Sequence, residues 1–495
     1  MIRPRRRCRS AHGFAPEIEI ADRSKSTTIV AAYCTMLKNV AALLLMVLVG
    51  FGCATEPRAS ARTAPVAPKV VLIIGDGMDD QQITIARHYL VGQGGRLTLD
   101  GMPERGQVRI ETVAEENPSL PDYVPDSANT ATSMASGIVT SAGRIATTAG
   151  TDEDVTTIME LAAAAGFGTG IVTTSSVTDA TPASFVAHVN WRLCEGPRGM
   201  VPRNTGVFVG NCTADLKANG GKGSIAEQIA ASALDIVLGG GMQQFAQPAE
   251  GEVTKTVIDL AAENGFKLVR TAAELAAVER RGKILGVFSP GTMPVQWRGA
   301  GDAKAERIEH TDGRPVLAEP FSCEPNPDFA PMPTLPAMTR SALDHLDDGR
   351  GFMLMVESAS IDKQSHLRRP CGQIGELEQL DDTLKVVLDY AREHPETLVL
   401  VTADHSQAAQ LVPETSVLAS LNAASPGYFA RVRTPEGAVM GVNYATNDSN
   451  VQEDHTGADV PLFASGPGAE AIPASLRQAE IFTLLASHMG LVPRP

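Results

Sequence analysis

Metal-binding side chains stand directly after three strand-like stretches of this 495-residue chain. Apolar, β-branched runs lead into Asp76, into Glu357, and into the adjacent pair Asp404 and His405. In an open α/β sheet the carboxyl ends of the strands line one crevice, so these side chains are expected to meet there although they are far apart in sequence. Carboxylate and imidazole groups together are ligands for divalent cations. The sequence therefore predicts a metal centre at this edge of a sheet.

Three further residues extend this predicted centre. Asp362 and His366 are four positions apart, which places them on one face of a helix and within reach of one ion. Such a pair is also typical of a solvent-exposed helix. His455 precedes the apolar run 460–464 and is either a third ligand or a solvated loop histidine.

Ser127 is the candidate nucleophile. It follows Asp126 at the start of a Ser/Thr/Ala-rich stretch that we expect to be helical. The unpaired N–H groups and positive dipole at a helix N-terminus suit an anion such as a phosphoryl group, although either residue can be an ordinary helix cap. The chain has no Gly-x-Ser-x-Gly motif around Ser127, so a metal would have to lower the pKa of the hydroxyl.

Three residues that follow the run 170–174 add oxygen ligands and a cation. Asp179 and Thr181 carry the hard oxygen donors that magnesium prefers. Arg192 can place its guanidinium fork on two phosphate oxygens. Taken singly, each of them is an ordinary loop residue.

The elements that position these residues alternate between strand and helix patterns. This alternation predicts an α/β fold, a three-layer α/β/α sandwich with a mostly parallel central sheet. The expected strands are 70–74, 170–174, 235–238, 283–288, 352–356, 398–402 and 460–464. The expected helices are 80–90, 127–136, 155–165, 224–233, 339–346, 375–393 and 478–489. Two stretches, 190–223 and 407–455, are expected to be long functional loops.

The composition excludes some partners. With 43% hydrophobic residues and a net charge of −15, the chain is expected to fold into a soluble body without specific nucleic-acid binding, which requires a basic surface. Anionic substrates stay possible because clustered metal cations can outweigh the net charge locally.

The N-terminal region has the pattern of an export signal. The apolar run 40–52 is shorter than the roughly 20 residues that span a bilayer and suits the core of a signal peptide. We therefore interpret 36–53 as a signal peptide that begins at Met36, and 1–35 as a mis-called extension. Residues 54–68 are predicted to form an Ala/Pro-rich tether.

Two processing routes fit the end of this signal. Small residues before Cys53 predict lipidation of that cysteine, whereas an A-x-A sequence at 59–61 is typical of ordinary cleavage. In either case we expect an exported, periplasmic protein, and the lipidation route would anchor it to the membrane as a lipoprotein.

Four cysteines lie beyond the leader, namely Cys194, Cys212, Cys323 and Cys371. An even number in an exported chain indicates two disulfides. Three pairings are possible, of which the local one, 194 with 212 and 323 with 371, is the simplest. The alternative is four unpaired buried thiols.

Together these motifs resemble the bacterial alkaline phosphatases. The matching segments are 74–78, 126–128, 179–183, 357–366, 370–376, 402–405 and 453–457. The likeness covers about residues 69–490 and implies one catalytic domain, 69–495, with an alkaline-phosphatase-like fold. It further implies broad hydrolysis of small phosphate monoesters through a phosphoserine, and a homodimer.

The resemblance also implies roles for individual residues around two Zn²⁺ and one Mg²⁺. The implied ligands are Asp362, His366 and His455 for one zinc, Asp76, Asp404 and His405 for the other, and Asp76, Thr181 and Glu357 for magnesium, with Asp179 on its waters. Ser127 is the implied nucleophile, and the implied phosphate-binding residues are Asp126, Arg192 and Lys363.

Trp191 and Ser365 depart from the family pattern beside the site. Two rival functions stay open at this point. One is a phosphodiesterase or phosphonate hydrolase of the same superfamily, which would usually lack the magnesium ligands Thr181 and Glu357. The other is a catalytically dead metal-binding surface lipoprotein, which would lack the nucleophile or Arg192.

Overall fold

The computed structural model describes residues 67–202, 211–312, 314–414 and 426–491. These residues belong to one compact unit, Ala64–Pro495. The extension, the signal peptide, Cys53 and nearly all of the tether lie outside the described residues. Among the helices described, none is both long enough and apolar enough to cross a membrane.

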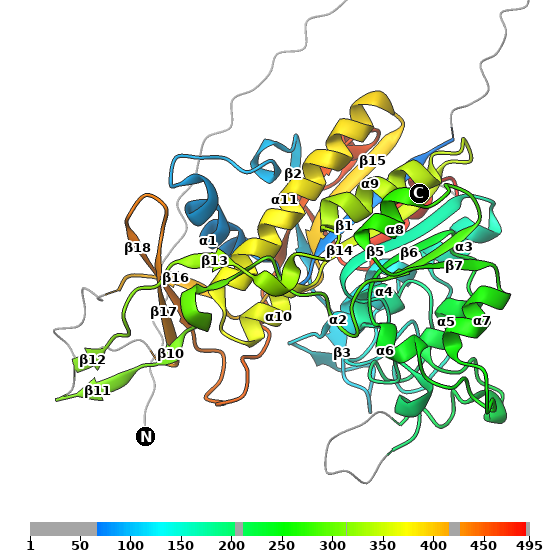
Figure 1. The fold of residues 1–495 in the computed structure, drawn as a ribbon, viewed down its shortest axis with the longest axis horizontal. Helices are drawn as coiled ribbons and strands as arrows, with labels where there is room; N and C mark the ends of the chain where they lie inside the picture. Colours follow the sequence, from blue (N-terminus) through cyan, green and yellow to red (C-terminus); the bar gives the residue numbers. More distant parts are fainter. Residues whose placement is uncertain (1–66, 203–210, 313, 415–425, 492–495) are drawn as a thin grey trace, which may run out of the picture. The chain divides into compact units, whose positions relative to one another are not determined.

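A ten-stranded sheet in the order β20-β2-β19-β15-β1-β14-β5-β6-β8-β7 forms the centre of the fold (Figure 1). Its strands are β1 (Lys69–Gly75), β2 (Glu104–Arg109), β5 (Gly168–Ser176), β6 (Ile236–Gly240), β7 (Phe266–Val269), β8 (Lys283–Val287), β14 (Phe352–Ser358), β15 (Thr397–Ala403), β19 (Val460–Ser465) and β20 (Ser475–Arg477). Within the described residues, β19 alone runs antiparallel to both of its neighbours. The predicted mostly parallel sheet is confirmed, and so are its seven predicted strands.

Helices cover both faces of this sheet. One group packs together over β1, β14 and β15, and consists of α1 (Asp80–Val91), α9 (Leu335–Leu346) and α11 (Pro370–Glu393). A second group lies against β5 and β14, and consists of α2 (Ser127–Ser136), α3 (Ile158–Ala164), α4 (Ala180–Ala183) and α12 (Glu480–His488). Every residue of β1, β5, β14 and β15 is buried, as expected for parallel strands covered on both sides.

The register of the central strands brings the predicted ligands together. Gly75 at the end of β1 pairs with Ser358 on one side and with Ala403 on the other. The next residue, Asp76, donates its backbone N–H to the Ser358 carbonyl at 3.1 Å. Asp76 and Asp404 therefore leave the sheet at the same level.

The stretch 407–455 differs from the predicted loop. It contains three strands of a four-stranded antiparallel sheet with the order β10-β17-β18-β16. These strands are β10 (Glu306–Arg307), β16 (Gln410–Val412), β17 (Tyr428–Arg433) and β18 (Val439–Tyr444). Short strands that pair only with each other leave a weak periodicity in the sequence, and their Gly- and Asn-rich neighbours conceal it.

The remaining elements are small. The strands are β3 (Thr112–Val113), β4 (Pro121–Asp122), β9 (Trp297–Gly299), β11 (Glu309–Thr311), β12 (Arg314–Val316) and β13 (Cys323–Pro325). The helices are α5 (Ile225–Ala231), α6 (Met242–Phe245), α7 (Val257–Glu263), α8 (Ala272–Ala277) and α10 (Ser360–His366).

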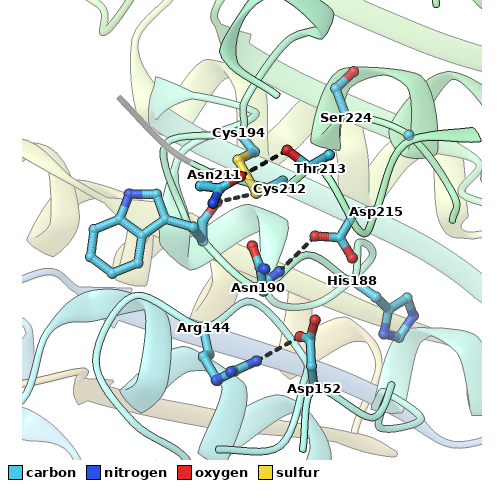
Figure 2. The surroundings of a disulfide bond; sticks show 12 residues. Arg144, Asp152, His188, Asn190, Cys194, Asn211, Cys212, Thr213, Asp215 and Ser224 are labelled. Carbon is cyan, nitrogen blue, oxygen red and sulfur yellow. Dashed lines mark hydrogen bonds and ion pairs between the residues drawn. A yellow bond between two sulfur atoms is a disulfide. The ribbon is translucent and has the colours of Figure 1, made fainter. Parts of the chain in front are cut away.

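Both disulfides have the local pairing. Cys194 is bonded to Cys212, and Cys323 in β13 is bonded to Cys371 in the first turn of α11. Figure 2 shows the first of these bonds above the contact between Asn190 and Asp215, in which the Asn190 backbone N–H donates to the carboxylate at 3.1 Å. The disulfide thus anchors the chain two residues after Arg192.

Candidate active site

Helix α10 and the loop before β19 supply the first group of metal-binding side chains. Asp362 and His366 lie on one face of α10, as the spacing predicts, and His455 approaches from the loop. The Nε2 atoms of the two histidines are 3.0 Å apart. The Asp362 carboxylate lies 3.3 Å from the Nε2 of His366 and 3.5 Å from that of His455. Each residue can therefore offer one ligand atom to a single ion.

The ends of β1 and β15 supply the second group, formed by Asp76, Asp404 and His405. His405 Nε2 lies 3.4 Å from carboxylate oxygens of both aspartates. Ser127 Oγ is 3.1 Å from His405 Nε2 and 3.4 Å from Asp76 Oδ1. Asp404 Oδ2 is buried without a hydrogen-bond partner among the described residues, which is costly unless a cation occupies the site.

The histidines of both groups present lone pairs to the centre. Each contacts a backbone carbonyl through Nδ1, and the contacts are His366 with Glu453, His455 with Pro125, and His405 with Ser406. A carbonyl only accepts, so each Nδ1 carries a hydrogen, and a ring in its neutral form therefore has its lone pair on Nε2. Two lone pairs that face each other at 3.0 Å repel unless a cation lies between them. Metal-binding histidines typically donate their other ring N–H to a backbone carbonyl or a carboxylate in this way.

The charges of the metal-free centre are unbalanced. Burial, together with the neighbouring Asp404 and Asp362 carboxylates, raises the pKa of Asp76 well above its ordinary value. Burial and the nearby His405 lower the pKa of His455 to about 4. Burial opposes ionisation of Asp362 as well, but His366 and His455 hold the pKa of this carboxyl well below its usual range. Divalent cations would compensate the crowded carboxylates.

A third set of donors consists of oxygen atoms alone. Glu357 at the end of β14 is near enough to Asp76 for its charge to raise the pKa of that carboxyl, and Thr181 in α4 lies close to Glu357. Burial raises the pKa of Glu357 to about 7, although a hydrogen bond from the Thr173 hydroxyl opposes the shift. Thr181 Oγ1 is buried without a partner at hydrogen-bonding distance among the described residues. An oxygen-only donor set suits magnesium.

Ser127 is the first residue of α2, and Asp126 is its N-cap, so the capping interpretation applies to Asp126. The Asp126 side chain accepts from the Asn129 backbone N–H in a capping box. Arg192 lies between two carboxylates, 3.2 Å from Asp126 and 3.0 Å from Asp179. Lys363 Nζ also contacts Asp179 at 2.5 Å. These two cations hold the pKa of Asp179 below its ordinary value against the opposing effect of burial.

The chain matches a known protein family over most of its length. The alkaline phosphatase family model matches residues 67–453. The chain belongs to the alkaline phosphatase family. The matched stretch ends before His455, which the fold nevertheless brings to the first ligand group.

Two similar proteins illustrate this family membership. The streptomycin-6-phosphate phosphatase of Streptomyces griseus is 39% identical over 88% of this chain and 94% of its own length. The alkaline phosphatase of Escherichia coli K12 is 39% identical over 86% of each chain. This alkaline phosphatase is accordingly a phosphoric monoester hydrolase of a metal-dependent family.

The fold has solved counterparts. The alkaline phosphatase of the Antarctic bacterium TAB5 superimposes with a TM-score of 0.62 at 23% identity, covering 86% of this chain and all of that one. The Thermus thermophilus alkaline phosphatase gives a TM-score of 0.60 at 19% identity, covering 87% and 92% of the two chains. Both comparisons bear on the fold alone and agree with the α/β architecture.

A cavity of about 810 Å³ opens over Ser127 in this alkaline phosphatase. Its lining includes Arg192, Lys363, His366 and His455. Ser127, two cationic side chains and the first ligand group are therefore accessible from one cavity. The predicted site residues that line this cavity are Ser127, Arg192, Asp362, Lys363, His366 and His455.

Several residues that hold this alkaline phosphatase centre in place escaped the sequence analysis. Gln407 donates to Asp362 at 2.5 Å, and Gln478 donates to the Asp404 carbonyl at 2.6 Å. Arg368 forms a buried ion pair with Glu453. Gln407 stands two positions after the predicted ligand His405. This closeness in sequence was the one feature that could have identified Gln407 as a residue of the site.

The two departures from the family pattern have separate structural roles in this alkaline phosphatase. Trp191 packs on Gly143, where an added Cβ would lie 2.2 Å from the indole ring. The Gly143 carbonyl accepts from the Arg192 backbone N–H at 2.7 Å, so the indole covers the segment that fixes the arginine. Ser365 is buried and donates its hydroxyl to the Ile361 carbonyl within α10.

Proposed function

We propose that this alkaline phosphatase hydrolyses phosphate monoesters of many alcohols through a phosphoserine on Ser127, at a centre for two zinc ions and one magnesium ion. The observation that carries the proposal is the position of Ser127 Oγ, 3.1 Å from His405 Nε2 and 3.4 Å from Asp76 Oδ1. A hydroxyl group in this position adjoins a ligand group and lies in the substrate cavity.

The donor chemistry assigns residues to each ion. Imidazole-containing groups suit zinc, and the oxygen-only group suits magnesium. The first zinc would be held by Asp362, His366 and His455, the second by Asp76, Asp404 and His405, and magnesium by Asp76, Thr181 and Glu357, with Asp179 on its waters. When bound, the cations supply a lowered pKa for the serine hydroxyl and stabilise charge on the leaving alcohol oxygen.

The reaction then consists of two displacements at phosphorus, the first by Ser127 and the second by water. Arg192 binds two nonbridging oxygens of the ester through its guanidinium fork. The Ser127 oxygen attacks phosphorus, the bond to the alcohol oxygen breaks, and the alcohol leaves with a proton. Water attacks the phosphoserine, releases inorganic phosphate and returns a proton to Ser127. Lys363, 2.5 Å from Asp179, adds positive charge beside the phosphoryl group. Two in-line displacements give net retention of configuration.

Replacement of Ser127 tests this mechanism. Ser127→Ala should abolish hydrolysis of p-nitrophenyl phosphate, while zinc and magnesium contents measured by mass spectrometry stay those of the wild type. Ser119→Ala, at an exposed serine of the preceding loop, is the matched control. Full activity in the Ser127 variant would rule out the phosphoserine route. Faster hydrolysis of bis-p-nitrophenyl phosphate than of the monoester would instead favour a phosphodiesterase.

We also propose that the chain is exported to the periplasm. Two disulfides in the described domain suit an oxidising compartment. Signal peptide 36–53 would direct export, and Cys53 would carry the lipid. Cys53→Ala should move the enzyme from the membrane to the soluble fraction, and unchanged fractionation would exclude lipidation. A homodimer is the proposed assembly, and sedimentation equilibrium at micromolar concentration tests it.

A further inference from the structure

The active-site cavity is larger than a phosphoryl group requires. It has a volume of about 810 Å³, and both Ser127 and Arg192 line it. Cavities of roughly 300–1,000 Å³ accommodate whole small-molecule ligands, with apolar walls and a few polar groups that orient the ligand. The space beyond the phosphoryl position is therefore available to the alcohol portion of a monoester.

Besides Pro125, two exposed apolar side chains line this space. Val124 is 46% exposed and Leu193 is 42% exposed, and both line the same cavity as the nucleophile. Single exposed apolar residues are common on protein surfaces. Here, however, each stands within three positions of a residue that handles the phosphoryl group, because Val124 precedes Ser127 and Leu193 directly follows Arg192.

The segments that carry these side chains are tied to each other. The ion pair between Asp126 and Arg192, 3.2 Å long, joins the segment before α2 to the segment that contains Leu193. On the far side of Leu193, the disulfide between Cys194 and Cys212 closes the loop. A backbone that is tied in place before binding loses little conformational freedom when a ligand contacts it. The two side chains are thus suited to recognition.

The cavity also has a polar part. Thr446, Gln452 and Asp454 line it together with the apolar pair. The Asp454 carboxylate accepts from the Asn447 amide at 2.7 Å. A ligand in this space meets apolar surface and hydrogen-bonding groups together.

We propose that Val124 and Leu193 form an apolar subsite for the leaving alcohol, so that the enzyme favours phosphate monoesters of amphipathic alcohols that carry an extended apolar surface. The inference rests on the proposed function, because it concerns the same cavity and the same reaction. The occupant is the alcohol portion of the substrate, since an ester whose phosphorus lies at Ser127 has its alcohol next to the side chains that share this cavity with Ser127.

A series of n-alkyl phosphates tests the subsite. Methyl, butyl and hexyl phosphate release alcohols of similar acidity, so differences in kcat/KM report contacts rather than leaving-group chemistry. In the wild type, kcat/KM should rise roughly tenfold from methyl to hexyl phosphate. This total equals the low end for a single methylene in an enclosed apolar pocket, because Val124 and Leu193 form a half-exposed surface. In the double variant Val124→Ser, Leu193→Ser, the ratio of hexyl to methyl should fall to about one.

A matched control distinguishes the loss of the subsite from the general effect of making the protein surface more polar. Ile138 is 41% exposed and does not line this cavity, so Ile138→Ser should keep the wild-type ratio. The subsite would be overturned if the hexyl-to-methyl ratio of kcat/KM were one in the wild type, or if the double variant kept the ratio of the wild type. In both cases, turnover of methyl phosphate would still support the proposed function. Failure of the wild type on every monoester would instead reject the proposed function. Dissociation of an oligomer in the double variant would assign both residues to a subunit contact and also overturn the proposal.

Discussion

Arg368 Nε lies 2.6 Å from Glu453 Oε1, and both side chains are buried. The Glu453 carbonyl contacts His366 Nδ1, and its backbone N–H donates to the His366 carbonyl at 3.0 Å. His455 follows two positions later. The ion pair therefore holds the loop that completes the first ligand group.

Loss of this ion pair should lower zinc affinity. Arg368→Ala leaves the Glu453 carboxylate buried without its cation, which typically costs about 3–5 kcal/mol in stability. Zinc content after dialysis should fall toward one ion per chain, and the Tm should fall with it. Arg369→Ala, at the neighbouring solvent-exposed ion pair with Asp302, should retain zinc. Full zinc content in the Arg368 variant would show that the loop is held by other contacts.

Metal removal should destabilise the domain. Asp76, Asp362 and Asp404 are crowded and buried, so their repulsion is uncompensated without cations. Dialysis against a chelator should lower the Tm by several degrees, since ligands at about 1,000 times their Kd contribute about 4 kcal/mol. Added zinc should restore the Tm, whereas added sodium chloride of equal ionic strength should not. An unchanged Tm on chelation would contradict a metal centre.

Arg192 should contribute mainly to the affinity of the enzyme for the phosphate group. Arg192→Lys keeps the charge but removes the fork that can contact two phosphate oxygens. The KM for p-nitrophenyl phosphate and the Ki for inorganic phosphate should both rise about 10- to 100-fold, the range of one or two charged hydrogen bonds. Arg198→Lys, at an exposed position of the same segment, serves as the control. Unchanged inhibition by phosphate would remove Arg192 from the binding site.

Glu376 in α11 should make stability depend on pH. Burial raises its pKa from 4.5 to about 7, although the hydroxyl of Thr174 opposes the shift. Between these values the unfolded chain loses a proton that the folded chain keeps, so stability falls as pH rises through this window, by up to about 3 kcal/mol.

Glu376→Gln removes this titration. Its free energy of unfolding in urea should decrease less between pH 4.5 and pH 8 than that of the wild type. Glu393→Gln, at the exposed end of the same helix, should leave the wild-type slope intact. Parallel pH profiles for wild type and Glu376→Gln would mean that the folded protein ionises this carboxyl normally.

Local sequence patterns were sufficient to predict much of the central sheet and several of the candidate metal ligands. Buried parallel strands are continuous apolar runs, so the ends of β1, β14 and β15 could be recognised in the sequence together with Asp76, Glu357 and Asp404. The four-residue spacing of Asp362 and His366 predicted a shared helix face, and α10 confirms it. These features depend on residues that are close in sequence.

Only the tertiary structure decided the contacts between distant segments. The choice among three disulfide pairings, the ion pair between Arg368 and Glu453, and the gathering of Val124 and Leu193 at one cavity all depend on long-range packing. The short strands of the second sheet were missed for the same reason, because each is stabilised by its partners rather than by its own residues. Sequence patterns identified the chemistry of the ligands, and strand register together with loop closure determined which of them meet.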